Sequence, residues 1–223
     1  MFVILPNAFG DAATNMAIDA ALLETLPPGM VAFRHYGWTE PSMTFGYSQG
    51  HRDVADRAPK DVTLCRRMTG GGIVDHRNDW TYALVIDRKA PPAGISSTDL
   101  YAGVHLALAE ALTAQSVETQ LAPCPRKCGE ATAKADGPDQ CFMQPVMNDV
   151  LDQAGRKIAG AAMKRTRKGL LLQGSVDRGA LPAPIDFNAF LEGFIDGLGK
   201  SLQIVRHHPG DLRPFFQGER IER

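Results

Sequence analysis

Three consecutive glycines, at positions 70–72, lie between the basic pair Arg66-Arg67 and a run typical of a β-strand that leads to His76. Glycine loses more conformational freedom on folding than any other residue, so each one in a presumptive sheet costs about 0.5–1 kcal/mol relative to alanine. A turn or bulge at a hairpin corner explains a single glycine. Three together, flanked by arginines and a histidine, predict a backbone that a ligand approaches closely.

A second segment, over residues 155–165, places Lys157 among small residues. Ile158 and the alanines that follow are typical of a buried strand, and Gly155 indicates the turn that leads into it. Most lysines are solvated, and a lysine of a solvated hairpin is the common alternative. Lys157 differs because its neighbours are too small to fill space, which leaves room for a ligand.

The hydrophobic pattern predicts helices over Thr14–Leu26, Ser96–Ala114 and Phe187–Leu198. Ile18, Ala21 and Leu22 define the expected buried side of the first helix. A variant capping box, Ser96-x-x-Asp99, opens the second helix, in which Leu100, Val104, Leu108 and Ala111 recur at helical spacing. The segment 122–140 is predicted to be a loop.

Strands are predicted over Val31–Tyr36, Met43–Tyr47, Val62–Arg67, Gly72–Asp75, Thr81–Asp87, Met147–Leu151, Lys157–Met163 and Leu170–Val176. This order indicates an α+β fold with helices against a mixed or largely antiparallel sheet.

The length of 223 residues allows one sizeable core, and we expect one domain over residues 1–223. No run approaches the roughly 20 apolar residues of a membrane span, and the N-terminus does not read as a signal peptide. We therefore expect a cytoplasmic protein with no membrane partner.

The net charge of −1 gives no broad attraction to nucleic acid. A local basic cluster comprises Lys164, Arg165, Arg167 and Lys168. One interpretation is a solvated turn. The others are a contact surface for an acidic acyl-acceptor domain and a contact surface for the phosphates of a nucleotide.

Several segments, in this order, resemble the lipoate–protein ligase and octanoyltransferase family, which shares its catalytic domain with biotin–protein ligases. Residues 15–24 look like the first helix of the family, and residues 33–38, with Pro41, Gly46 and Gln49, resemble its early strand pair. The triple-glycine loop, the Gly-Arg-Lys-Ile-Ala-Gly segment and residues 171–175 follow. The resemblance implies a biotin/lipoate ligase-like catalytic domain without the C-terminal accessory domain of many full-length ligases. A separate accessory subunit is therefore a possible partner.

Within the family, the ligases join lipoate or octanoate to ATP, with Mg²⁺, and pass the acyl group from the acyl-adenylate to one lysine of a lipoyl carrier domain. That carrier is a 2-oxoacid dehydrogenase subunit or a glycine cleavage H-type protein. By resemblance, Lys157 is the catalytic residue, since a lysine can stabilise charge on the α-phosphate, and Asp149 is the Mg²⁺ ligand. The resemblance assigns acyl or adenylate binding to Arg66, Arg67, Thr69, Gly70, Gly71, Gly72, His76, Asn148, Gly160 and Ala161.

Cys141 supports a different activity, because certain octanoyltransferases of the family carry a nucleophilic cysteine at this place. A thiolate there could take octanoate from an acyl carrier protein as a thioester and transfer it without ATP or any other cofactor. The spacing from His76 to Tyr82 also looks closer to the transferases, whereas Asn148-Asp149 looks ligase-like. Gln173 departs from the histidine usual in the family. A third hypothesis is a non-catalytic protein that binds a lipoyl or other acyl group.

Overall fold

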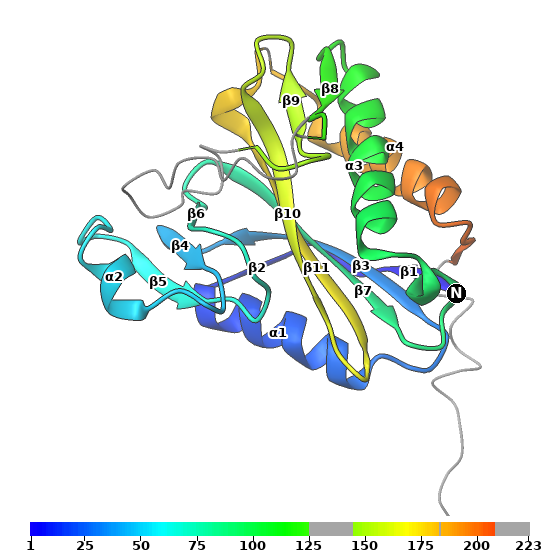
Figure 1. Cartoon of the computed structure of the whole chain (residues 1–223), viewed down its shortest axis with the longest axis horizontal. Helices are drawn as coiled ribbons and strands as arrows, with labels where there is room; N and C mark the ends of the chain where they lie inside the picture. The colour runs from blue at the N-terminus through cyan, green and yellow to red at the C-terminus, as the bar shows by residue number, and fades with distance from the viewer. Residues whose placement is uncertain (125–144, 183, 208–223) are drawn as a thin grey trace, which may run out of the picture.

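The computed structural model describes residues 1–124, 145–182 and 184–207. Within these residues, nine strands form one mixed sheet in the order β12-β1-β3-β7-β11-β10-β9-β8, with β2 also paired to β3 (Figure 1). The run from β3 to β8 is antiparallel, whereas β1 pairs in parallel with β3 and β12. The predicted α+β class with a mixed sheet is confirmed. The strands are β1 (Phe2–Ile4), β2 (Ala8–Gly10), β3 (Val31–Trp38), β7 (Asp79–Asp87), β8 (Thr119–Leu121), β9 (Val150–Asp152), β10 (Lys157–Arg165), β11 (Gly169–Asp177) and β12 (Arg206–His207).

A small second sheet has the order β5-β4-β6 and lies beside the main sheet, together with the short helix α2 (Figure 1). Here β4 pairs in parallel with β5 and antiparallel with β6. The loop that carries the three glycines connects β5 to β6, so this small sheet decides where the loop lies. Its elements are β4 (Ser42–Phe45), α2 (His51–Ala55), β5 (Thr63–Arg66) and β6 (Val74–Asp75).

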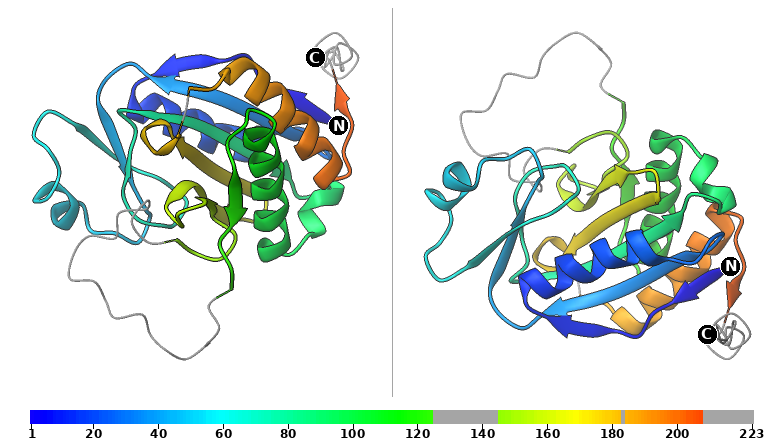
Figure 2. Two further views of the ribbon diagram at one scale, coloured as in Figure 1. Left: turned by 90° about the horizontal axis from the view of Figure 1, so that it is seen from above. Right: turned by 90° about the horizontal axis from the view of Figure 1, so that it is seen from below.

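Helices cover both faces of the main sheet: α1 (Ala12–Thr25) lies on one face, and α3 (Ser97–Thr113) and α4 (Phe187–Ser201) lie on the other (Figure 2). Ser96 accepts a hydrogen bond from the Asp99 amide at 3.1 Å, which confirms the predicted cap. The helix α1 ends before Pro27, because a proline disfavours helical geometry in the residue that precedes it. Two short 3₁₀ turns, η1 (Pro91–Gly94) and η2 (Arg178–Ala180), complete the connections.

The main core lies between the sheet and the pair α3 and α4. Trp80 and Tyr82 of β7 pack with Phe190 and Phe194 of α4, and all four rings are buried. The four residues predicted to line the inner side of α3 are buried too. This core makes the sheet a rigid support for a site on its other face. No helix in the described ranges is long and apolar enough to span a membrane.

The predicted buried side of α1 is wrong. Ile18 is 38% exposed, whereas Asn15 and Asp19 are buried. The guanidinium of Arg34 on β3 donates to the Asp19 carboxylate at 2.8 Å and to the Asn15 side-chain oxygen at 3.0 Å. Burying a charge is costly unless a partner compensates it, and that partner, 15 residues away in sequence, is invisible to a hydrophobicity pattern.

Two predicted strands begin too early. The strand β6 starts at Val74, so the three glycines lie in a loop and not in a sheet, and Gly71 has φ +85°. Similarly, β9 starts at Val150, because Asn148 has φ +69°, a left-handed conformation that interrupts extended structure. The predicted loop 122–140 lies largely outside the described residues. The sequence analysis missed several short elements, namely β1, β2, α2, β8 and β12.

Candidate active site

A cleft lies on the face of the main sheet opposite α3, where β10 and β11 meet β3, β7, the small sheet and α1. Its walls come from segments up to about 160 residues apart, so only the tertiary structure assembles it. Five of the predicted site residues line it, namely Arg67, His76, Lys157, Gly160 and Ala161. The other lining residues are Met16, Tyr36, Thr44, Val74, Thr81, Ala162, Gln173, Gly174 and Ser175.

Lys157 is the first residue of β10 and follows a turn in which Gly155 has φ +81°. Its side chain is 3% exposed, and its Nζ lies 2.7 Å from Oδ2 of Asp149. The alternative of a solvated hairpin lysine is therefore wrong. A Cβ on Gly160 would lie 2.6 Å from this Nζ, so glycine at position 160 provides the space that the ammonium group occupies.

Asp149 is completely buried beside Lys157. Its Oδ1 accepts a hydrogen bond from the Tyr101 hydroxyl at 2.5 Å, and its Oδ2 accepts one from the Val146 amide at 2.7 Å. With Lys157, three protein donors already use the carboxylate. The described residues contain no group of three His, Cys, Asp or Glu side chains that could hold a metal by themselves, but Mg²⁺ bound with a nucleotide needs only one or two carboxylates. The role of Asp149 as a Mg²⁺ ligand therefore stays a prediction.

The two predicted arginines point in different directions. Arg66 is exposed, and its guanidinium lies 5.4 Å from the centre of the Phe45 ring. Arg67 is buried and donates to the backbone carbonyl oxygens of Gly70 at 2.9 Å and Gly72 at 2.8 Å. Arg67 therefore holds the glycine loop in place from inside, a role that the sequence did not indicate.

His76 connects the small sheet to the main sheet. Its Nδ1 lies 2.7 Å from Oδ2 of Asp79, its Nε2 lies 2.7 Å from the Thr44 hydroxyl, and its ring stacks on Trp38 with centroids 4.0 Å apart. Because a carboxylate only accepts, Nδ1 donates to Asp79 in this contact. The same Thr44 oxygen accepts from Arg67 at 2.8 Å. The imidazole is thus fully engaged with protein partners.

A second buried chain of polar groups fixes the other wall of the cleft. The Thr69 hydroxyl donates to Oε1 of Gln173 at 2.8 Å, and Nε2 of Gln173 donates to Asp19 at 2.7 Å. Burial raises the pKa of Asp19, and the nearby Arg34 guanidinium opposes that shift. Sequence reasoning missed Asp19, Arg34 and Thr44, because their contacts join different elements of the fold and leave no local pattern.

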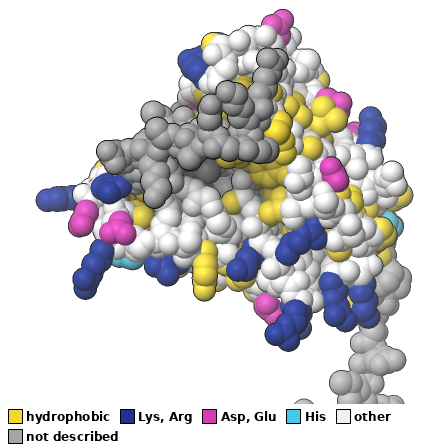
Figure 3. Space-filling view, viewed as in Figure 1, with side chains coloured by type: hydrophobic (Ala, Val, Ile, Leu, Met, Phe, Trp, Pro, Cys, Tyr) yellow, Lys and Arg dark blue, Asp and Glu magenta, His cyan; other side chains and the backbone are white. Residues whose placement is uncertain are grey.

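The remaining predicted residues lie around the cleft or outside the described ranges. Thr69, Gly70–Gly72 and Asn148 are not among the lining residues. Asn148 instead lines a shallow groove with Tyr101, Val146, Met147 and Met163, on a face where Figure 3 shows hydrophobic side chains gathered beside α3. Its carbonyl oxygen lies 2.7 Å from Nδ1 of His105. Cys141 lies outside the described residues.

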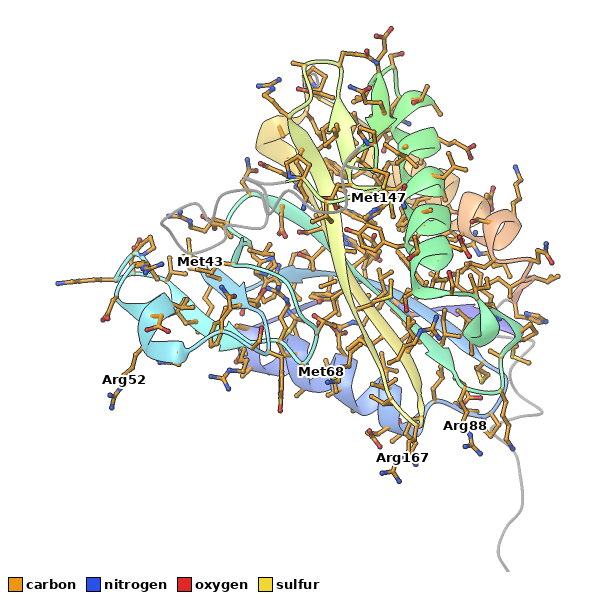
Figure 4. All side chains as sticks on the ribbon, in the orientation of Figure 1. Met43, Arg52, Met68, Arg88, Met147 and Arg167 are labelled. Carbon is orange, nitrogen blue, oxygen red and sulfur yellow. The ribbon has the colours of Figure 1, made fainter. Side chains whose placement is uncertain are left out.

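The predicted basic cluster is divided by the structure. Arg165 donates to the Ser97 hydroxyl at 2.9 Å and to the carbonyl oxygens of Ala93 and Ile95. Lys164 approaches the Tyr47 ring, with Nζ 5.0 Å from its centre. Arg167 and Lys168 lie at the β10–β11 turn, where Figure 4 shows Arg167 near Arg88, away from the small sheet. Arg165, Arg167 and Lys168 are exposed, and Lys164 is partly buried.

Comparison with known proteins defines the family to which this fold and cleft belong. The sequence profile of the lipoyl protein ligase A/B catalytic domain matches residues 11–178. This chain belongs to that family.

Among curated relatives, the octanoyltransferase LipM of Oceanobacillus iheyensis is 32% identical over 180 residues, which cover 78% of this chain and 63% of that protein. The octanoyltransferase LipM of Staphylococcus aureus is 30% identical over 192 residues, which cover 83% of this chain and 67% of that protein. The chain thus spans about two thirds of the length of these relatives.

Solved structures agree on the fold. A bi-partite lipoate protein ligase from Thermoplasma acidophilum has a TM-score of 0.66 at 17% identity, covering 97% of this chain and 92% of that one. A lipoate-protein ligase A bound with ATP also has a TM-score of 0.66 at 17% identity, covering 97% and 94%. The expected biotin/lipoate ligase-like fold is confirmed.

Proposed function

We propose that this protein is an acyltransferase that moves an octanoyl group from a thioester donor to a lysine of a lipoyl carrier domain. The observation that carries the proposal is the sequence similarity to relatives named octanoyltransferase LipM. The site is compatible with it, because a buried ammonium group lies at an otherwise largely apolar cleft. An octanoyl chain needs an apolar wall, and its carbonyl needs a positive hydrogen-bond donor.

The proposed reaction has two steps and uses Cys141 as the nucleophile. The Cys141 thiol gives up its proton and the thiolate attacks the carbonyl carbon of an octanoyl group on acyl carrier protein; the new carbon–sulfur bond replaces the one to the carrier, whose thiolate leaves and takes up the proton. The neutral amine of the lipoyl-domain lysine then attacks this thioester, an amide forms as the carbon–sulfur bond to Cys141 breaks, and a proton of the amine passes to the Cys141 sulfur. Both steps develop negative charge on the same carbonyl oxygen, which a lysine ammonium can stabilise. We assign this role to Lys157.

ATP-dependent ligation of lipoate or octanoate is the less supported alternative. It is the activity that the family resemblance first implied, and it would use ATP as a substrate together with Mg²⁺ as the metal. The hydrogen bonds to Asp149 favour the transferase, since they already engage the carboxylate expected to bind the metal. The ligases of similar fold are only 17% identical, and that similarity concerns the fold alone.

The decisive experiment incubates the purified protein with a lipoyl carrier domain and measures the mass of the carrier. One reaction contains octanoyl-acyl carrier protein without ATP, and the other contains octanoate, ATP and Mg²⁺. We expect octanoylation only in the first. A gain of mass only in the second would replace the proposal with a ligase, and no gain in either, despite octanoate binding, would favour a non-catalytic binding protein.

Two cysteine variants then test the nucleophile. Cys141→Ser is expected to abolish transfer. Cys65→Ser is the matched control, because Cys65 lies on β5 and is not among the cleft-lining residues, and burial raises the pKa of its thiol, which disfavours a thiolate. Equal activity of the two variants would contradict the assignment of Cys141.

A further inference from the structure

Three separate segments hold the ammonium group of Lys157. The lysine comes from β10, Asp149 from the turn before β9, and Tyr101 from the first turns of α3. The ion pair between Nζ and Oδ2 is 2.7 Å long, and the side chains of Lys157 and Asp149 are 3% and 0% exposed. A charge so far from water is stable only where its partner is fixed and its remaining hydrogen-bonding capacity is used.

The Tyr101 hydroxyl is the element that fixes Asp149. It donates to Oδ1 at 2.5 Å and accepts from the backbone amide of Ala161 at 3.1 Å. Ala161 lies on the same strand as Lys157 and lines the cleft. Tyr101 therefore ties the carboxylate to the strand that carries the lysine, and the phenol is oriented by a backbone group that cannot rotate away.

Glycine at position 160 completes the arrangement. A Cβ there would lie 2.5 Å from Cε and 2.6 Å from Nζ of Lys157, and 3.0 Å from Oδ1 of Asp149. Any side chain would push the ammonium away from its present place. The position of the charge is thus determined by a gap on one side and by an ion pair on the other.

We propose that Tyr101 and Asp149 are positioning residues that hold the Lys157 ammonium group as a fixed, cationic hydrogen-bond donor for the carbonyl oxygen of the acyl group. This inference rests on the proposed function, and it deepens that function by adding a residue of α3 outside the segments that suggested the family. It also gives Asp149 a role that requires no metal. A fixed donor does not have to reorient when negative charge develops on the carbonyl oxygen. This preorganisation is the main source of electrostatic stabilisation of a transition state.

Other polar groups near Asp149 do not share this role. Nδ1 of His105 is engaged with the carbonyl oxygen of Asn148, and burial lowers the pKa of this imidazole to about 4, so it is neutral. The Tyr82 hydroxyl is buried and has no hydrogen-bond partner within the described residues. Tyr82 therefore offers a control for Tyr101: Tyr82 is buried and Tyr101 is partly buried, the charge of Asp149 acts on both phenols, but only Tyr101 donates to that carboxylate.

The test compares steady-state transfer by the wild type, Tyr101→Phe, Tyr82→Phe and Asp149→Asn. We expect Tyr101→Phe to lower kcat about tenfold, because it removes one strong hydrogen bond to the charged pair, while KM for the octanoyl donor changes less than about twofold. Asp149→Asn should lower kcat at least as much, and Tyr82→Phe should leave kcat and KM unchanged. Equal kcat for Tyr101→Phe and wild type, or a rise in KM alone, would overturn the proposal. Since Asp149→Asn removes a buried charge, the milder Tyr101→Phe keeps the test decisive if Asp149→Asn does not fold.

A second measurement does not depend on activity. In protein labelled with ¹⁵N at the lysine side chains, a buried, paired ammonium group exchanges slowly with water and gives a resolved signal, which Lys157→Arg identifies by its loss. We expect Tyr101→Phe to shift or broaden this signal and Tyr82→Phe to leave it unchanged. An unperturbed signal in Tyr101→Phe would contradict the positioning role even if transfer is observed. Absence of transfer by the wild type, with the expected signals, would refute the proposed function alone.

Discussion

Gly46 and Gly71 are in contact through their backbones. A Cβ on Gly46 would lie 2.0 Å from the carbonyl oxygen of Gly71, a separation that no side chain can tolerate. The chain leaving β4 therefore runs directly against the glycine loop, whose conformation at Gly71, with φ +85°, favours glycine. The glycines thus serve contact within the protein at least as much as contact with a ligand.

Gly46→Ala is expected to lower the free energy of unfolding by about 2 kcal/mol or more, since the loop backbone must move. Gly70→Ala is the matched control from the same loop: a Cβ there has nothing within 4 Å. The control should be neutral or slightly stabilising, by up to about 1 kcal/mol, because alanine reduces the freedom of the unfolded chain. Urea denaturation measures both, and similar losses for the two variants would contradict the contact.

Thr44→Val tests whether the hydroxyl between His76 and Arg67 supports the site. Valine has nearly the same shape but removes the hydroxyl that contacts both the Arg67 guanidinium and Nε2 of His76. We expect a loss of about 1–3 kcal/mol in the free energy of unfolding, together with weaker acyl transfer. Thr63→Val, on the exposed part of the neighbouring strand β5, should change stability by less than about 0.5 kcal/mol. Thermal denaturation of both variants would show no difference if the hydroxyl were unimportant.

Gln173→Leu tests the connection between the glycine loop and α1. The change leaves the Thr69 hydroxyl and one oxygen of Asp19 without their amide partner. A loss of about 1–3 kcal/mol is expected, because the buried Thr69 hydroxyl loses its acceptor, while Oδ2 of Asp19 keeps the Tyr36 hydroxyl as a donor. Gln120→Leu is the control, since the Gln120 side chain is exposed on β8 and donates to a backbone carbonyl at 3.1 Å. Equal unfolding midpoints in urea for both variants would disprove the connection.

Stability should fall at acid pH because of His105. Burial lowers the pKa of this imidazole from 6.5 to about 4, so the unfolded chain binds a proton more readily than the folded chain. The contribution of His105 is therefore fully present above pH 6.5 and decreases by about 3 kcal/mol as the pH falls to 4, at ~1.4 kcal/mol for each pKa unit.

The measurement is the free energy of unfolding as a function of pH for the wild type and His105→Asn. The variant should be less stable at pH 8 but should lose less stability between pH 6.5 and 4. His51→Asn, at an exposed position on α2, should keep the pH dependence of the wild type. Parallel pH curves for the wild type and His105→Asn would refute the prediction.

Local sequence patterns predicted much of the fold. The capping box at Ser96 and the helical spacing of Leu100 and Leu108 are short-range features, and the structure agrees with them. The strand that begins at Lys157 was also predicted, since a turn glycine precedes a run of buried residues. Short edge strands such as β2 and β12 were missed, because two or three residues carry too little periodic signal.

The sequence by itself determined the order of the longer helices and strands, because caps, turn residues and hydrophobic period act over a few neighbouring positions, and its ordered motifs indicated the family and the candidate lysine. Only the tertiary structure decided which polar groups are buried together. Asp19 pairs with Arg34, Thr69 with Gln173, and Lys157 with Asp149 and, through it, Tyr101. A buried charge is stable only beside its partner, and that partner comes from a different element of the fold, so no local pattern can identify it.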